Sequence, residues 1–149
     1  MSHEIRDALP ADLPAILDIY NDAVRNTTAI WNETPVDLAN RQAWFDARAQ
    51  QGYPILVAVD GADVLGYASF GDWRPFEGFR HTVEHSVYVR SDQRGKGLGP
   101  ALMRALIERA QGGGKHVMVA AIESGNAASV HLHERLGFVV TGPVSYTHL

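Results

Sequence analysis

The stretch Gln93-Arg94-Gly95-Lys96-Gly97-Leu98-Gly99 lies between a predicted strand and a predicted helix and carries glycines at alternate positions. Glycine adopts backbone conformations that other residues avoid, so the N–H groups of this loop can approach a bulky anion closely. The N-terminus of the following helix adds N–H donors and a favourable dipole. Four basic residues and one Asp occupy positions 90–104, whereas the whole chain has a net charge of −4. These features predict a binding site for a diphosphate.

Two well-known nucleotide-binding loops do not match this stretch. A P-loop requires Ser or Thr after its Gly-Lys pair, and here Gly97 follows Lys96. A dinucleotide-binding fingerprint requires glycine at position 100, where the chain has Pro100. On the residues alone, a glycine-rich loop that only reverses the chain direction remains an alternative.

Strands and helices alternate on both sides of the loop. Apolar residues three and four positions apart predict the helices, and runs of β-branched residues predict the strands. Thr34 is expected to cap the second helix, and Gly52 is expected to end it. The expected strands cover residues 4–9, 54–59, 64–70, 81–89 and 116–122, with one more from 137, and the expected helices cover 13–24, 35–51, 98–110 and 126–136. This order predicts a mixed α/β sheet.

Length and composition exclude several classes of protein. The 149 residues fit a single domain, and the absence of cysteine excludes disulfides, thiolate zinc sites and a covalent cysteine intermediate. The acidic chain has no basic tail, which argues against nucleic-acid binding. No apolar run approaches the roughly 20 residues of a membrane helix, and residues 1–6 lack the apolar core of a signal peptide. We therefore expect a cytoplasmic protein with no membrane partner.

The histidines do not predict a metal site. His81 and His85 are four positions apart, which on a strand separates them by about 13 Å, too far for shared ligation. His131 and His133 are two positions apart in a predicted helix. We expect no bound metal.

The glycine loop resembles the Gln/Arg-x-x-Gly-x-Gly/Ala motif with which the GNAT superfamily of N-acetyltransferases binds the pyrophosphate of coenzyme A. Residues 126–138 are similar to the Asn-helix-Gly-Phe signature of that family. Three segments resemble the phosphinothricin and methionine sulfoximine N-acetyltransferases: Ile19-Tyr20-Asn21, Phe70-Gly71-Asp72-Trp73-Arg74 with Phe76, and Val83-Glu84-His85-Ser86-Val87-Tyr88-Val89. The resemblance covers residues 4–142 approximately. It implies an α/β (α+β) fold with a twisted, mostly antiparallel sheet flanked by about four helices, and a homodimer.

The resemblance also implies an activity. The enzyme would transfer the acetyl group of acetyl-CoA, its co-substrate, to the α-amino group of a small amino acid analogue such as methionine sulfoximine, methionine sulfone or phosphinothricin. Without cysteine, direct attack in a ternary complex is the economical route. Two alternatives remain: acetylation of another amine, such as a polyamine or a protein N-terminus, and a non-catalytic acyl-CoA-binding domain of the same fold.

Two residues are expected to move protons. Glu84 is the candidate base, because its valine-rich strand offers an apolar setting that would raise the pKa of the carboxyl. A surface carboxylate or an ion-pair partner is the structural alternative. His133 stands where related acetyltransferases carry a Tyr that protonates the departing thiolate. A histidine can donate a proton as well, or it can serve only in packing.

Cofactor and substrate are expected to meet along one strand. Backbone N–H groups near residues 87–89 would polarise the acetyl carbonyl, and Arg74 would bind the substrate carboxylate. The resemblance implies cofactor contacts at Val87, Tyr88, Val89, Arg94, Gly95, Lys96, Gly97, Leu98, Gly99, Pro100, Asn126 and Arg135. The expected substrate residues are Trp73, Arg74, Pro75, Phe76, Glu84, His85 and Ser86.

The end of the chain departs from the family pattern. Residues 144–149 do not resemble the two strands with which relatives complete the sheet. We therefore expect the C-terminal strands to be missing from a truncated domain over residues 1–149. Such a sheet would have an unpaired edge, with reduced stability or completion by a neighbouring chain.

Overall fold

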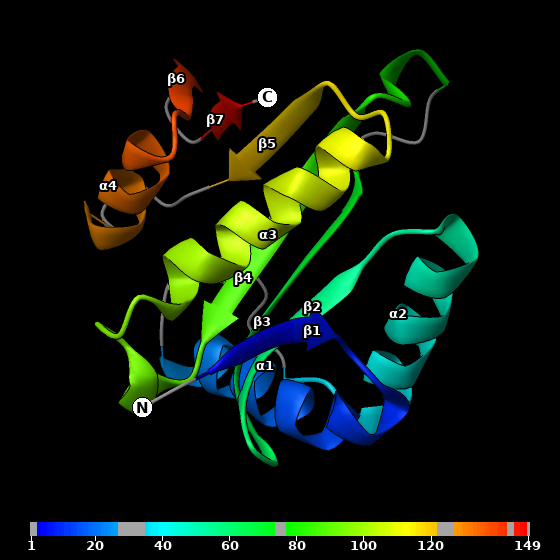
Figure 1. Cartoon of the computed structure of the whole chain (residues 1–149). Helices are drawn as coiled ribbons and strands as arrows, with labels where there is room; N and C mark the ends of the chain where they lie inside the picture. The colour runs from blue at the N-terminus through cyan, green and yellow to red at the C-terminus, as the bar shows by residue number, and fades with distance from the viewer. Residues whose placement is uncertain (1–2, 27–34, 74–76, 122–126, 143–144, 149) are drawn as a thin grey trace.

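The computed structural model describes residues 3–26, 35–73, 77–121, 127–142 and 145–148. Within this part of the chain, one sheet has the strand order β1-β2-β3-β4-β5-β7-β6 and is flanked by four helices (Figure 1). The strands are β1 (Glu4–Asp7), β2 (Ile55–Asp60), β3 (Asp63–Asp72), β4 (Thr82–Val89), β5 (Val117–Ala121), β6 (Val139–Gly142) and β7 (Ser145–His148). The helices are α1 (Leu13–Asn26), α2 (Leu38–Gln51), α3 (Leu98–Gly112) and α4 (Ala127–Arg135). Among these strands only β4 and β5 pair in parallel, so the predicted mixed, mostly antiparallel sheet is confirmed.

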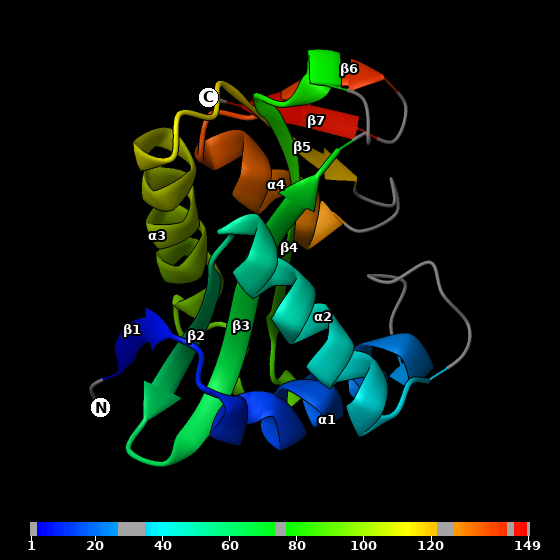
Figure 2. The ribbon, with the colours of Figure 1, turned by 90° about the vertical axis from the view of Figure 1, so that its right-hand side faces the viewer.

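The sheet is covered on both faces, as Figure 2 shows. On one face α1 and α2 pack on Ile55, Val57 and Tyr67. On the other face α3 packs on Leu56 and Phe70. Because β2 is buried on both sides, its sequence is apolar without interruption rather than alternating. In the described part of the chain, no helix is long and apolar enough to cross a membrane.

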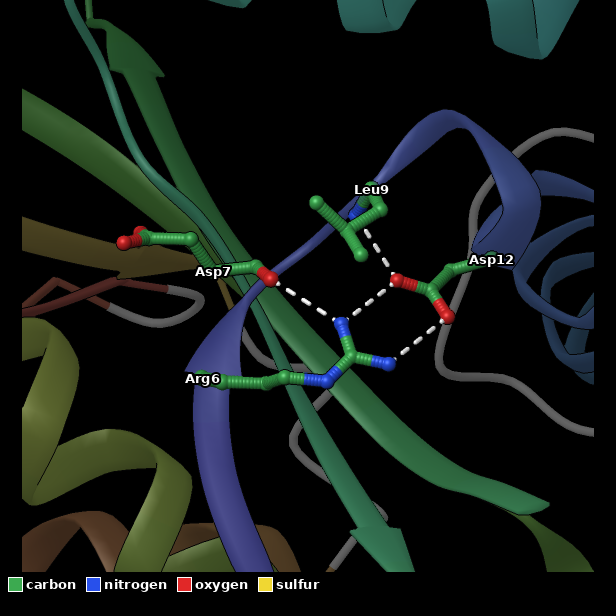
Figure 3. A network of polar contacts seen from close by, with 4 residues as sticks. All are labelled: Arg6, Asp7, Leu9 and Asp12. Atoms are coloured by element: carbon green, nitrogen blue, oxygen red, sulfur yellow. Dashed lines mark hydrogen bonds and ion pairs between the residues drawn. The ribbon is translucent and has the colours of Figure 1, made fainter. Parts of the chain in front are cut away.

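A network of polar contacts holds the start of the chain (Figure 3). The Arg6 guanidinium donates hydrogen bonds of 2.8 and 3.0 Å to the Asp12 carboxylate and thereby lowers the pKa of that carboxyl. The same carboxylate accepts the Leu9 N–H at 2.7 Å. Because Asp12 takes this N–H, the strand that was predicted over residues 4–9 ends earlier, at Asp7.

Helix α2 begins later than the sequence predicted. Val36 lies outside the helix, because its N–H and carbonyl both bond to the Asn21 side chain, at 2.9 and 2.8 Å. Asp37 takes the capping position and accepts a first-turn N–H at 2.9 Å. The prediction of Thr34 as the cap is therefore wrong, and Thr34 itself lies outside the described residues. The predicted end at Gly52 is confirmed by its left-handed backbone, with φ of 73°.

The last strand pairs contradict the prediction for the C-terminus. β7 lies between β5 and β6 and pairs antiparallel with both. The prediction that residues 144–149 do not continue the sheet is wrong for Ser145–His148. Within the described residues the sheet edges are β1 and β6, and β5 is paired on both sides.

Candidate functional site

Strands β4 and β5 separate partway along their length. β5 pairs with β4 only at residues 82–84, opposite 117–119, whereas β3 pairs with β4 along residues 83–89. β4 therefore runs on past the end of β5 (Figure 1). Among the described residues, no strand pairs with positions 85–89 on the β5 side. We call this opening the β4–β5 fork.

Backbone N–H groups of β4 point into the fork at alternate residues. The Arg90 N–H donates to the Leu65 carbonyl at 2.8 Å, in register with the β3–β4 pairing. Backbone polar groups alternate sides along an antiparallel strand, so the even-numbered residues of β4 bond to β3. The N–H groups of Val87 and Val89 therefore point toward the fork, where they can donate to a carbonyl oxygen.

The glycine loop adjoins the fork at the N-terminus of α3. Gly95 and Gly97 have positive φ values of 80° and 79°, a left-handed conformation that favours glycine. Arg94 and Lys96 are exposed on this loop, and the Lys96 ammonium donates to the Gln93 side chain at 3.1 Å. The loop thus presents two cations and several backbone N–H groups on one surface.

The first turn of α3 completes this surface. Leu98 is buried in the core, so it offers the site only its backbone. Pro100 has no N–H, which leaves the N–H groups of Leu98 and Gly99 as first-turn donors without a helical acceptor. A Cβ at Gly99 would lie 3.6 Å from Leu132 and 4.0 Å from Val89, so the loop, α4 and β4 converge here. Open N–H donors, left-handed glycines and two cations fit the pyrophosphate of coenzyme A.

The side chains of β4 divide between the two faces of the sheet. Tyr88 packs with the residues under α1 and α2, so Glu84 and Ser86, at even positions, lie on that face. His85 points to the opposite face, where it contacts Phe138. The structure brings two of the predicted substrate residues, Glu84 and Ser86, together on one face and places His85 on the other. Because side chains alternate between the two faces of a strand, the sequence already indicated that position 85 faces away from positions 84 and 86.

Glu84 occupies the last position before the fork. It is paired with Val119 of β5 and with Gly71 of β3. Its side chain is exposed, so the apolar surroundings that the valine-rich strand predicted do not enclose it. An exposed carboxylate at the mouth of the fork can reach a bound amine directly or through a water molecule.

Helix α2 places two arginines over the same face of the sheet, a feature that the sequence patterns did not single out. The Arg41 guanidinium lies 4.3 Å from the ring centre of Tyr20 and 4.7 Å from that of Trp44. Arg48 donates to the Ser69 hydroxyl at 3.1 Å. Burial and the nearby positive charge of Arg41 lower the pKa of Arg48. The sequence contained a signal for this arrangement, because residues 41, 44 and 48 are three and four positions apart and so share one face of a helix.

On the α3 face, two buried histidines meet beside the fork. The Nε2 atoms of His85 and His133 are 2.9 Å apart, and the His133 side chain is only 2% exposed. Burial, followed by the positive charge of a protonated His133, lowers the pKa of His85 to about 3. His133 therefore faces a neutral imidazole rather than open solvent.

The other predicted site residues have separate positions. Trp73 is half-buried directly after β3, and Arg135 is exposed at the last position of α4. Four predicted residues lie outside the described part of the chain: Arg74, Pro75, Phe76 and Asn126.

Comparisons with known proteins identify relatives of this architecture. The model of the acetyltransferase (GNAT) family matches residues 16–138. The L-methionine sulfoximine/L-methionine sulfone acetyltransferase of Pseudomonas paraeruginosa is 80% identical over 95% of this chain and 83% of its own length. An acetyltransferase structure from Salmonella typhimurium with its cofactor acetyl-CoA has a TM-score of 0.93 and 58% identity, over 95% of this chain and 82% of that chain. The structure of a phosphinothricin acetyltransferase from Sinorhizobium meliloti, in complex with acetyl-CoA, has a TM-score of 0.95 and 33% identity. This match covers 99% of the present chain and 88% of that chain.

The comparisons bear on the family of the chain and on its co-substrate. The family match covers the segment that holds the fork, the glycine loop and α4. The relatives named above are acetyltransferases, and the two solved structures hold acetyl-CoA. The chain therefore belongs to the GNAT family and is an N-acetyltransferase with acetyl-CoA as its co-substrate.

Proposed function

We propose that this enzyme acetylates the α-amino group of L-methionine sulfoximine, L-methionine sulfone or a closely related analogue such as phosphinothricin. The names of relatives at 80% and 41% identity support this substrate class. The observation that carries the proposal is the fork between β4 and β5, with the glycine loop at one end and Glu84 at its mouth. Donors for a thioester carbonyl and a carboxylate for the amine thus lie on one strand.

The glycine loop and the fork would hold the cofactor. Acetyl-CoA supplies the activated acyl group. The N–H groups of residues 95–99, with Arg94 and Lys96, would bind its pyrophosphate, since helix N-termini and cations both favour this charge. The N–H groups of Val87 and Val89 would polarise the acetyl carbonyl. Tyr88, Pro100, Asn126 and Arg135 complete the proposed cofactor contacts.

Two side chains would move the protons of the reaction. Glu84 would accept the proton of the attacking ammonium group, directly or through water, and so generate the nucleophilic amine. His133 would give a proton to the departing thiolate. Arg74 would bind the substrate carboxylate, and Trp73, Pro75, Phe76 and Ser86 would line the substrate pocket. With these roles, the amine attacks the thioester directly and no covalent enzyme intermediate is needed.

A thiol-release assay tests the proposal. Purified protein is mixed with acetyl-CoA and a panel that contains methionine sulfoximine, methionine sulfone, phosphinothricin, a polyamine and a short peptide. We expect rapid release with the amino acid analogues and little with the others. Glu84→Gln should lower kcat/KM by about 10²- to 10⁴-fold at neutral pH, and less at high pH, where the amine is already neutral.

Glu108→Gln is the matched control, because Glu108 is exposed on α3. This variant should retain the wild-type rate. Unchanged activity in Glu84→Gln would refute the base assignment. Tight coenzyme A binding without thiol release for any amine would instead support the non-catalytic acyl-CoA-binding alternative.

We further propose that residues 1–149 act as one domain in a cytoplasmic homodimer. The dimer rests on the resemblance to this enzyme family. The use of acetyl-CoA, which cells make and consume internally, supports the compartment. Light scattering coupled to size-exclusion chromatography measures the oligomeric state, and a monomer at micromolar concentration would contradict the dimer.

A further inference from the structure

The buried pair of His85 and His133 joins three elements beside the fork. His85 comes from β4, His133 from α4, and the His85 ring also contacts Val119 of β5. The exposed fractions of the two histidines are 8% and 2%. Phe138 packs against the pair, and its ring centre lies 5.7 Å from that of His85 and 5.0 Å from that of His133. The pair is therefore shielded from water, and each of its protons needs a defined position.

The neighbours of His85 determine where its proton lies. Its Nδ1 is 3.3 Å from the carbonyl oxygen of Val119. A carbonyl oxygen only accepts hydrogen bonds, so Nδ1 carries the hydrogen and donates it. Burial holds His85 neutral at physiological pH, because its pKa is lowered to about 3. A neutral imidazole with hydrogen on Nδ1 has a lone pair on Nε2.

The proton arrangement of His133 follows from this. The 2.9 Å contact joins two Nε2 atoms and needs one hydrogen between them. His85 has only a lone pair there, so the hydrogen belongs to Nε2 of His133. The described residues bring no third histidine or carboxylate to the pair, and two imidazoles alone make a poor metal site.

Val119 adds a second role for His85. Val119 is the last residue of β5 that pairs with β4, opposite Glu84. At this point the two strands separate, so the His85 side chain bonds to a carbonyl at the end of the backbone ladder. The ring holds β5 in place while the N–H groups of Val87 and Val89 stay directed into the fork.

We propose that His85 is a positioning residue, which fixes His133 in its Nε2–H tautomer and ties α4 to the end of the β4–β5 ladder. The inference extends the proposed function, in which His133 protonates the departing thiolate. Because the Nε2 hydrogen is committed to His85, that proton must leave from Nδ1 of a doubly protonated His133. The S–H bond forms, the Nδ1–H bond breaks, and a neutral His133 remains, which still donates its Nε2 hydrogen to Nε2 of His85.

Nitrogen-15 NMR of the histidine rings tests the tautomers without any substrate. In the full chain at pH 7.5, roughly a unit above the ordinary histidine pKa, we expect hydrogen on Nδ1 of His85 and on Nε2 of His133. We also expect the His85 signals to keep the chemical shifts of a neutral ring as the pH falls through the ordinary histidine range. Hydrogen on Nε2 of His85, or an ordinary titration of that ring, would overturn the proposal.

Two variants at position 85 separate its two contacts. The amide group of His85→Gln reaches as far as Nε2 and offers an oxygen to His133, whereas that of His85→Asn lies near Nδ1 and offers a donor to Val119. In His85→Gln, His133 should keep its hydrogen on Nε2, and most of kcat should remain. In His85→Asn, His133 should no longer be held in this tautomer, and kcat should fall by about tenfold or more, with little change in the KM for acetyl-CoA.

His131→Gln is the matched control, because His131 is exposed on α4 two residues from His133. It should leave both tautomers and kcat unchanged. Equal kcat in the Asn and Gln variants would overturn the positioning role. If no amine is acetylated by the wild type, the proposed function fails, while the NMR result still decides the tautomers.

Discussion

Acidification should destabilise this protein through His85 before any carboxylate contributes. The pKa of His85 is lowered from 6.5 to about 3, first by burial and then by the charge on His133. When the chain unfolds, His85 regains an ordinary pKa and binds a proton below pH 6.5. The folded state binds that proton only near pH 3, so the free energy of unfolding decreases as the pH falls between these values.

The size of this decrease is set by the single proton that the unfolded chain binds at His85 and the folded chain does not. Each pH unit within this window lowers the free energy of unfolding by about 1.4 kcal/mol. A change from pH 7 to pH 5 crosses roughly one and a half units of the window and should cost about 2 kcal/mol. Asp7 and Asp12 have lowered pKa values because Arg109 and Arg6 bond to them. Their contributions are lost only below about pH 4, outside this range.

Urea unfolding followed by circular dichroism measures this effect. Wild type, His85→Gln and the exposed-site control His131→Gln are compared at pH 7 and pH 5. Between pH 7 and pH 5, the free energy of unfolding of the wild type and of the control should fall by about 2 kcal/mol more than that of His85→Gln. This difference does not depend on how stable His85→Gln is at pH 7. The same pH dependence in all three proteins would refute the reasoning, because it would mean that His85 takes up its proton in the folded state.

Two glycines in the sheet give further predictions that the same unfolding measurement checks. A Cβ at Gly66 would lie 2.9 Å from the Tyr88 carbonyl oxygen, so Gly66→Ala should cost about 1–3 kcal/mol. Gly112→Ala, at an open helix end, should leave the free energy of unfolding unchanged or raise it slightly. Equal changes in Gly66→Ala and Gly112→Ala would contradict the steric argument. A Cβ at Gly71 would lie 2.8 Å from two guanidinium nitrogens of Arg48, so Gly71→Ala should cost about 1 kcal/mol. That cost should disappear in an Arg48→Ala background, and purely additive costs would exclude the coupling.

Local rules predicted the elements well where neighbouring residues decide the structure. The alternation along residues 81–89 predicted β4 and the faces of Val83, Glu84 and Tyr88. The helix end at Gly52 and the loop before α3 were also predicted, because both depend on glycine in a left-handed conformation. In each case the determining interaction lies within a few residues of the predicted feature.

Element boundaries were predicted wrongly where a side chain outside the element bonded to the backbone at its end. Thr34 and Asp37 are both good helix caps, and the choice between them depends on Asn21, which binds both backbone groups of Val36. The first strand ends early because Asp12 accepts the Leu9 N–H. Neither hydrogen bond follows from a periodic pattern, since each requires a particular turn of the chain.

The sequence by itself determined that a glycine loop precedes a helix, that Glu84 and Ser86 share a strand face, and that the chain resembles the GNAT acetyltransferases. Only the tertiary structure decided that Glu84 is exposed and that His85 meets His133, 48 positions further along. It also decided where β4 and β5 separate. The physical reason is that periodicity assigns a side chain to a face, whereas strand order and helix packing decide what that face meets.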